Sequence, residues 1–122
     1  MSLRLMPQEL EVWYLLPALR RELSKMFINL YWLNQKETAE ILGITESAVS
    51  QYLKDKRANE LRFDRHELKI IKDTADRILK DRKNSLNYLY SLSVKLRGTR
   101  SLCEFHKKHD FNLPSNCRLC KV

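Results

Sequence analysis

The segment spanning residues 34–57 constrains the fold of this chain more than any other, because it contains two helix starts separated by a single glycine. Asn34 is a favourable N-cap residue, and Glu37 follows at the spacing of a capping box. We therefore expect a helix that runs to about Leu42. Gly43 ends it, since glycine readily adopts the left-handed conformation that closes a helix.

A second helix is expected directly after this turn. Thr45 is a suitable N-cap for it, and the acidic Glu46 suits the positive end of the helix dipole. Its predicted range is 46–54. The methyl side chain of Ala39 lets the two helices cross closely. The side chains that we expect to face the core are Ile41, Leu42, Ile44, Val49 and Leu53. This pattern predicts a helix-turn-helix.

The outward face of the second helix carries short polar or methyl-bearing side chains and one amide. Such a face can enter the major groove of double-stranded DNA, where Gln51 can bond to an adenine edge. The cations that follow it, with Arg62 and Arg65 further along, are candidates for phosphate contacts. The candidate DNA-binding residues are Gln35, Thr45, Glu46, Ser47, Ala48, Ser50, Gln51, Lys54, Lys56 and Arg57.

The run Q-K-E-T-A-E-I-L-G-I-T-E-S-A-V-S-Q-Y-L resembles the helix-turn-helix of the phage-repressor type. The positions that match the spacing of that family are Gln35, Ala39, Gly43, Ile44 and Val49. Together with L-L-P-A-L-R near the start, A-V-S-Q-Y-L-x-x-K-R in the middle and a C-x-x-H…C-x-x-C tail, the chain resembles a group of predicted archaeal transcriptional regulators. This resemblance covers most of the chain and implies a compact DNA-binding regulator, without indicating its target gene.

The rest of the chain is predicted to be helical as well, because 2 glycines and 3 prolines in 122 residues leave few turns. That length supports one ordinary domain with a modest core. We predict an all-α helical bundle over residues 1–97, with the helix-turn-helix at about 34–54. A small metal-binding knuckle is predicted over residues 98–122.

The N-terminal part has an apolar stripe at spacings of three and four, which predicts a long amphipathic helix. The stripe consists of Val12, Leu16, Leu19, Leu23, Met26 and Leu30. Pro17 indicates that the helix either starts near Leu16 or kinks there. Its aromatic residues make this surface broader than one small core needs. Two interpretations stay open: part of it mediates homodimerisation, or all of it covers the helix-turn-helix core.

Two more helices are predicted after the helix-turn-helix. Asp64 can cap the first, with Glu67 at the capping-box spacing. Its expected core residues are Leu68, Ile71, Ala75 and Ile78. The second is expected from about Ser85 to Leu96, ending before Gly98. Its expected buried residues are Leu86, Leu89, Leu92 and Leu96.

All three cysteines lie in the tail, where a C-x-x-H pair and a C-x-x-C pair are separated by ten residues. Three thiolates and one imidazole suit tetrahedral zinc, and each pair can hold the metal from a tight knuckle. The predicted ligands are Cys103, His106, Cys117 and Cys120. His109 is an alternative fourth ligand. An iron–sulfur cluster is the alternative cofactor, and it would make the tail a redox sensor coupled to DNA binding.

The charge is unevenly distributed. Residues 1–53 hold 5 Lys and Arg against 6 Asp and Glu, whereas residues 54–122 hold 18 against 9. The basic surplus thus begins at the end of the predicted recognition helix, as expected if phosphates are contacted from there onward. No apolar run approaches the ~20 residues that span a bilayer. The N-terminus also lacks the basic segment followed by an apolar segment that is typical of a signal peptide. We therefore expect a cytoplasmic protein.

The sequence predicts binding and not catalysis. It has no Gly-rich phosphate loop, no nucleophile elbow and no His–carboxylate pair at a catalytic spacing. No small-molecule substrate or effector pocket is evident either. The favoured function is sequence-specific transcriptional regulation on double-stranded DNA. A protein-binding adaptor and an RNA-binding factor are the non-enzymatic alternatives, although an aromatic platform for stacking RNA bases is not apparent.

Overall fold

A computed structural model describes residues 4–110, 113–114 and 116–118, and within these ranges every regular element is helical, as predicted. The elements are α1 (Pro7–Leu10), the π-helical η1 (Glu11–Leu15), α2 (Leu16–Asn29), α3 (Gln35–Leu42), α4 (Glu46–Leu53), α5 (Arg65–Lys80), the short 3₁₀ helix η2 (Arg82–Asn84), α6 (Ser85–Leu96) and α7 (Arg100–His109). No helix in this part of the chain is both long and apolar enough to cross a membrane.

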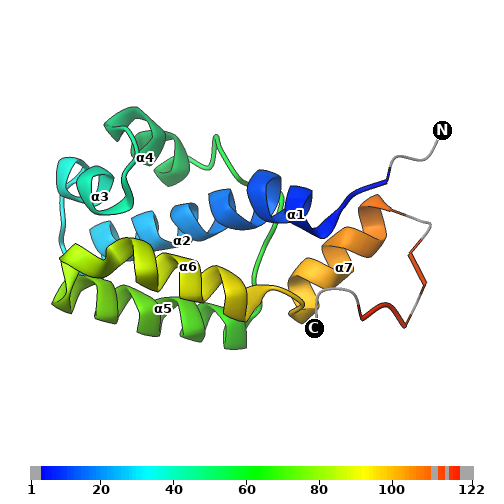
Figure 1. Ribbon diagram of the computed structural model, residues 1–122. Coiled ribbons are helices and arrows are strands. Elements are labelled where there is room, and N and C mark those ends of the chain that lie inside the picture. The colour runs from blue at the N-terminus through cyan, green and yellow to red at the C-terminus, as the bar shows by residue number, and fades with distance from the viewer. Residues whose placement is uncertain (1–3, 111–112, 115, 119–122) are drawn as a thin grey trace.

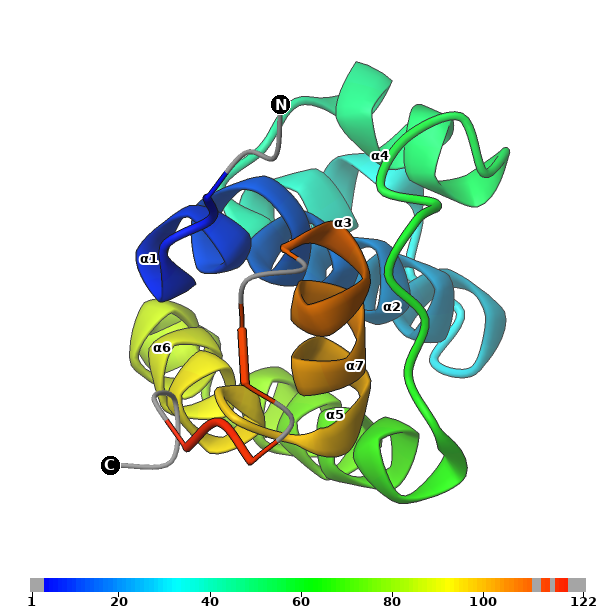
Figure 2. The ribbon, with the colours of Figure 1, turned by 90° about the vertical axis from the view of Figure 1, so that its right-hand side faces the viewer.

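Helix α2 lies at the centre of the molecule. Figure 1 shows α3 and α4 on one side of it and the antiparallel pair α5 and α6 on the other. Figure 2 shows α7 across one end of this arrangement, beside α1 and the loop that leads from α4 to α5. The α3–α4 pair and the α5–α6 pair therefore pack on either side of α2, whose side chains Leu19, Leu23 and Phe27 are completely buried.

The predicted N-terminal stripe is only partly buried, and the reason is the π-helical segment η1. Helices α1, η1 and α2 run on without a break, and Leu10 and Leu15, five residues apart, are both fully buried. A π turn inserts an extra residue and so rotates the residues after it relative to the regular spacing. Val12 is consequently 60% exposed, and Leu30, which lies just after the end of α2, is 52% exposed. Both belong to the predicted apolar stripe, and neither is part of the core.

Helices α5 and α6 lie close to their predicted ranges. The capping box is formed: the Asp64 carboxylate accepts the Glu67 N–H at 2.8 Å, and the Glu67 carboxylate accepts the Asp64 N–H at 2.8 Å. Ile71 and Ile78 are fully buried, and Leu68 is partly buried. Leu86, in the first turn of α6, is a correction, because it is 76% exposed and not part of the core.

Residues 100–109 form helix α7, which the sequence pattern did not predict. Leu102 and Phe105 belong to the same hydrophobic core as α2, α5 and α6. The helix also holds the start of the chain: His106 Nε2 lies 2.7 Å from the Leu5 carbonyl oxygen, and Asp110 accepts the Leu5 N–H at 3.1 Å. Apolar burial of this kind contributes about 1.5–3 kcal/mol per large side chain, so Leu102 and Phe105 stabilise the packing of α7 on the bundle.

Candidate nucleic-acid interface

The first helix of the predicted DNA-binding segment, α3, begins and ends where local chemistry requires. Asn34 Oδ1 accepts the Glu37 N–H at 2.8 Å, which confirms the predicted N-cap. Gly43 is left-handed, with φ 67° and ψ 36°. The chain then reverses so that the Ile44 N–H reaches the Ala39 carbonyl at 3.0 Å. The turn is therefore closed by backbone bonds to carbonyls that a helix end leaves free.

Helix α4 begins after this turn and packs on both α3 and α2. Thr45 Oγ1 accepts the Ala48 N–H at 3.0 Å, so the second predicted cap is also present. Val49 is fully buried and Ala39 is 5% exposed, which agrees with the expected close crossing of the two helices. Tyr52, which was not among the expected core residues, is 3% exposed.

The predicted recognition residues share one face of α4, with one exception. Glu46 and Ser47 are exposed in its first turn, whereas Ser50 and Gln51 are partly exposed one turn later. Ala48 is a correction: it is 5% exposed and faces the core, so it is not part of the outward face. The exposed candidates outside α4 are Gln35, Thr45, Lys54, Lys56 and Arg57.

The loop after α4 has an unusual backbone. Asp55 and Ala58 both have positive φ, at 55° and 58°. Residues other than glycine adopt this conformation at a cost, and they remain in it only where the surrounding structure holds them. The sequence carries no signal for it at Ala58, because alanine does not favour left-handed backbone.

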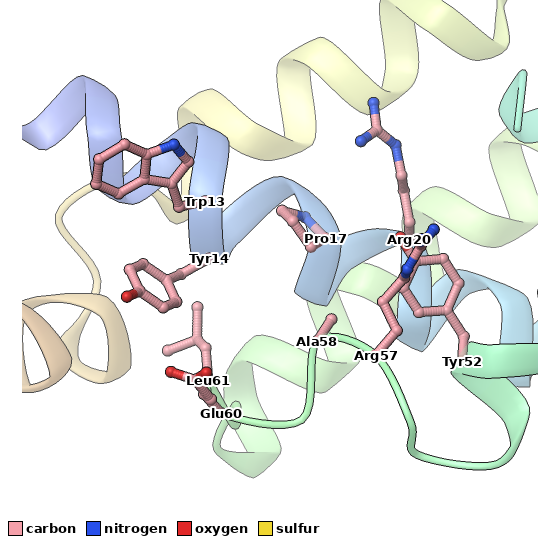
Figure 3. Close-up of a pocket in the computed structure, with 9 residues that line it drawn as sticks. All are labelled: Trp13, Tyr14, Pro17, Arg20, Tyr52, Arg57, Ala58, Glu60 and Leu61. Atoms are coloured by element: carbon pink, nitrogen blue, oxygen red, sulfur yellow. The ribbon is translucent and has the colours of Figure 1, made fainter. Parts of the chain in front are cut away.

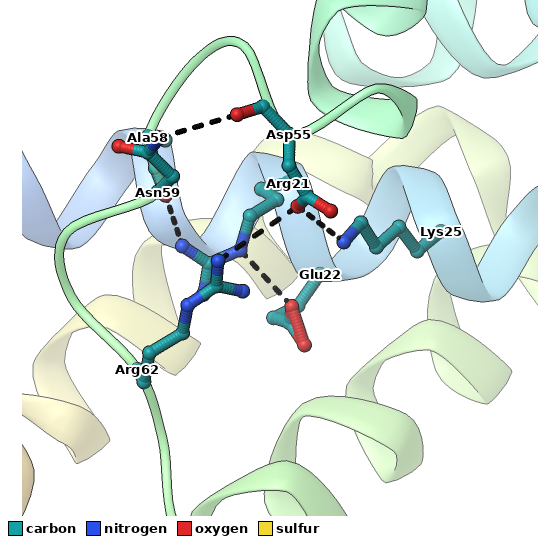
Figure 4. A network of polar contacts seen from close by, with 7 residues as sticks. All are labelled: Arg21, Glu22, Lys25, Asp55, Ala58, Asn59 and Arg62. Carbon is teal, nitrogen blue, oxygen red and sulfur yellow. Dashed lines mark hydrogen bonds and ion pairs between the residues drawn. The ribbon is translucent and has the colours of Figure 1, made fainter.

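Two cations of α2 hold this loop, as Figure 4 shows. Arg21, which is fully buried, donates from Nη1 to the Ala58 carbonyl oxygen and from Nε to the Glu22 carboxylate at 3.1 Å. Lys25 Nζ donates to the Asp55 carboxylate at 2.6 Å. That hydrogen bond is the main reason why the pKa of Asp55 is lowered from its usual value. The position of the loop is therefore set by α2.

The cations in the loop differ in what they contact. Arg62 Nη2 lies 3.9 Å from the Asp55 carboxylate, at the limit of an ion pair. The Arg57 guanidinium lies over the Tyr52 ring, 5.9 Å from its centroid, which is a cation–π contact. Lys54 and Lys56 are exposed beside it. Positive charge is thus concentrated at the C-terminal end of α4, next to the exposed polar face.

A cavity of about 360 Å³ lies beside this basic loop and was not predicted from the sequence. Its walls come from η1 and the start of α2, from the last turn of α4 and from the loop, as Figure 3 shows. The lining residues are Trp13, Tyr14, Pro17, Arg20, Tyr52, Arg57, Ala58, Glu60 and Leu61. The cavity forms where segments about 40 positions apart in the chain come together, and a local sequence pattern does not predict such long-range contacts.

The predicted metal ligands are only partly brought together. Cys103 and His106 lie one turn apart on α7, and Cys117 lies in the non-helical segment after it. Cys120 lies outside the described residues. Among the residues that are described, no three His, Cys, Asp or Glu side chains are grouped closely enough to hold a metal. His109, the alternative ligand, stacks on Phe105 with ring centroids 4.1 Å apart.

The chemistry of His106 is nevertheless compatible with metal binding. If Nε2 carries the proton, it donates to the Leu5 carbonyl, and Nδ1 keeps a free electron pair. Histidines that bind metals usually donate their second ring N–H to a backbone carbonyl or a carboxylate. The bond to Leu5 would orient the ring in this way.

Comparison with protein-family models, with curated protein sequences and with solved structures gave no match for this chain.

Proposed function

We propose that this chain is a sequence-specific transcriptional regulator that inserts α4 into the major groove of double-stranded DNA. The observation that carries the proposal is the pairing of α3 and α4 across a left-handed Gly43, with both helices capped and one polar face of α4 left open. The proposal also draws on the sequence resemblance to archaeal regulators with a phage-repressor-type helix-turn-helix. The proposed role is non-enzymatic and cytoplasmic.

Base recognition is assigned to the open face of α4. Ser47, Ser50 and Gln51 are short enough to let the helix approach base edges, and the Gln51 amide can form two bonds to adenine. Thr45 and Glu46 lie at the N-terminus of the helix, the end that commonly meets the bases. Glu46 can accept from a cytosine amino group. Ala48 takes no part, because it packs inward.

Backbone binding is assigned to the cations after α4, namely Lys54, Lys56 and Arg57. Phosphate contacts fix the orientation of the protein without reading sequence, and each one adds to the salt dependence of binding. Gln35 lies at the start of α3, where its amide and the helix N-terminus can meet another phosphate. Because Arg21 and Lys25 of α2 bind the loop, these cations keep a fixed position relative to α4.

The proposal is tested by comparing two variants on a selected DNA site and on random duplex DNA. Gln51→Ala removes a base contact, so discrimination between the two DNAs is expected to fall by about 1–3 kcal/mol. Arg57→Ala removes a phosphate contact, so affinity for both DNAs should fall alike and the salt slope should decrease by about one. Binding is measured by fluorescence anisotropy at several salt concentrations.

The control variant is Arg77→Gln, an exposed arginine of α5 that the proposal does not use. It should leave affinity, discrimination and salt slope unchanged. If Gln51→Ala and Arg57→Ala have the same effect on selected and random DNA, the assignment of α4 to the groove is wrong. Stronger binding to single-stranded RNA than to duplex DNA would favour an RNA-binding factor. Weak binding to both would favour a protein-binding adaptor.

We further propose that the tail binds one structural zinc ion through Cys103, His106, Cys117 and Cys120. The support is the donor set and the bond between His106 and Leu5, which leaves Nδ1 of the imidazole available. Elemental mass spectrometry of anaerobically purified protein should find about one zinc per chain. Iron with matching sulfide would instead indicate the redox-sensing alternative, and the absence of both metals would refute the site.

A homodimer is the proposed assembly, since two half-sites are commonly read by dimers. Support comes from exposed apolar residues on η1 and α6. Leu86 and Tyr90 of α6 line a shallow groove together with Leu16, and Val12 and Val94 are exposed on η1 and α6. Analytical ultracentrifugation of wild type and Leu86→Lys should give a dimer and a monomer respectively. A monomeric wild type, with and without DNA, would exclude this assembly.

A further inference from the structure

The cavity beside the basic loop has the size and the lining of a small-molecule site. Its volume is about 360 Å³, within the range of ordinary ligand pockets. It opens next to the end of α4, so any occupant would contact the proposed DNA-binding segment and the N-terminal helices together (Figure 3). Nothing in the proposed DNA contacts requires such a hollow.

Aromatic side chains form much of its wall. Trp13 is 55% exposed although it lies against the cavity, and Tyr14 and Tyr52 contribute rings from η1 and α4. Tyr14 is held from behind by Phe105, whose ring centroid lies 4.6 Å away. A fixed tyrosine and an exposed tryptophan favour a flat, unsaturated occupant, because ring faces stack with little loss of side-chain entropy.

Within the described part of the chain, Arg57 is one of two cations that line the cavity. Its guanidinium contacts the Tyr52 ring, and among the described residues no carboxylate forms an ion pair with it. Arg20 also lines the cavity, although Figure 3 shows its guanidinium directed away from Arg57. Among the described lining residues Glu60 is the only carboxylate, and it also lines a neighbouring hollow that contains Lys108. The described lining thus carries two arginines against one carboxylate, and this balance of charge favours an anionic group.

We propose that this cavity binds a small planar aromatic carboxylate. The ring of the ligand would lie against Trp13 and Tyr14, and its carboxylate would accept hydrogen bonds from the Arg57 guanidinium. Planar guanidinium and carboxylate groups match in geometry and form paired hydrogen bonds. A neutral analogue of the same shape gains only the stacking contacts, so the carboxylate determines the selectivity.

Ligand binding would oppose DNA binding through a shared residue. This step rests on the proposed function, in which Arg57 contacts a DNA phosphate. A guanidinium that is drawn into the cavity and neutralised by a carboxylate is less available to the phosphate, so each ligand lowers the affinity for the other by the same factor. The regulator would thus release DNA when the aromatic acid accumulates.

The binding step is tested on the full chain without DNA, by nuclear magnetic resonance of the two indole N–H groups. The probes are benzoate, salicylate, indole-3-carboxylate and 2-naphthoate, each added up to about 10 mM so that even weak ligands are detected. At least one should shift the Trp13 signal to saturation. The Trp32 signal is the internal control, because this residue lies in the α2–α3 turn and is 88% exposed. No saturable Trp13 shift with any probe would overturn the proposal.

Selectivity is tested with the matching neutral amide and with three variants. The amide, Arg57→Gln and Trp13→Ala should each weaken binding tenfold or more, whereas Arg77→Gln should leave it unchanged. Trp13→Ala should remain folded, since the side chain is largely exposed. An amide that binds as tightly as its acid would refute the role of Arg57.

The coupling to DNA is a separate measurement. The best carboxylate should lower the affinity of wild type for duplex DNA, and the loss should disappear in Arg57→Gln. If the ligand binds but the protein has no affinity for DNA, the proposed function is wrong and the ligand site stands. If both bind independently, the shared use of Arg57 is refuted.

Discussion

The left-handed backbone at Gly43 makes a contribution to the free energy of unfolding that can be measured by substitution. An added Cβ at this position would meet no heavy atom within 4 Å, so Gly43→Ala introduces no clash with neighbouring residues. The remaining cost is that of the left-handed backbone, at φ 67°, which destabilises an L-residue by about 1–2 kcal/mol. Alanine recovers about 0.4–1 kcal/mol by restricting the unfolded chain. The expected net loss is therefore about 1 kcal/mol.

This loss is measured by urea denaturation of wild type and variant, monitored by circular dichroism. The midpoint should fall while the slope stays constant, because the native structure is otherwise preserved. Gly43→Asn is the matched control, since asparagine tolerates left-handed backbone better than alanine and should lose less stability. If Gly43→Ala were as stable as wild type, or if the two variants lost the same amount, the reasoning from φ would be refuted.

Two further predictions concern pH. Lys25 lowers the folded pKa of Asp55 below its usual 3.8, so this pair stabilises the protein above pH 3.8 and the benefit is lost as the pH falls through the folded value. Asp55→Asn, which tolerates the same backbone, should be less stable than wild type at neutral pH and should match it in strong acid. Burial and the hydrogen bond to Asp76 raise the pKa of Tyr31 to about 12, so wild type should lose its advantage over Tyr31→Phe between pH 10 and 12. Urea denaturation across these ranges checks both, and a constant difference would contradict either.

The helix boundaries were predictable because their signals are local. Asn34, Thr45 and Asp64 each bond to a backbone N–H three residues away, so the sequence alone contains both partners. Gly43 acts through its own backbone. The fold class and the two-helix unit depend on such contacts, and they agree with what the sequence predicts.

The wrong predictions arise where one sequence pattern fits two different structures. A spacing of three or four shows that residues share a helix face, but it does not show which face is buried when several are apolar. Val12 was misplaced because the π turn between Leu10 and Leu15 leaves no mark in the residue types. Leu86 lies one turn before Tyr90, and both are exposed along α6. In the sequence, Leu86 shares the helical spacing of the buried Leu89, Leu92 and Leu96, so the pattern alone assigns it to the core.

The tail shows the same ambiguity. Cys103 and His106 at a spacing of three fit a metal knuckle and also fit one face of a helix, and the structure has them on α7. A metal knuckle and a helix face differ in the surroundings of Cys103 and His106. In the structure, these surroundings follow from the packing of Leu102 and Phe105 on the bundle. The proposed metal site would therefore take two of its ligands from a helix that packs on the bundle through its own apolar side chains.

This placement gives the tail a physical contact with the proposed ligand cavity. His109, Phe105 and Tyr14 form a cluster of rings, with centroids 4.1 Å apart for His109 and Phe105, 4.6 Å for Phe105 and Tyr14, and 6.1 Å for His109 and Tyr14. Tyr14 is part of the cavity wall, whereas Arg57 on the opposite side belongs to the loop that α2 holds through Ala58. A change in the tail that moved Phe105 would remove the support of Tyr14 while leaving the hold on the loop intact. The ligand affinity of the cavity should therefore respond to the tail before the arrangement of the DNA-contacting cations does.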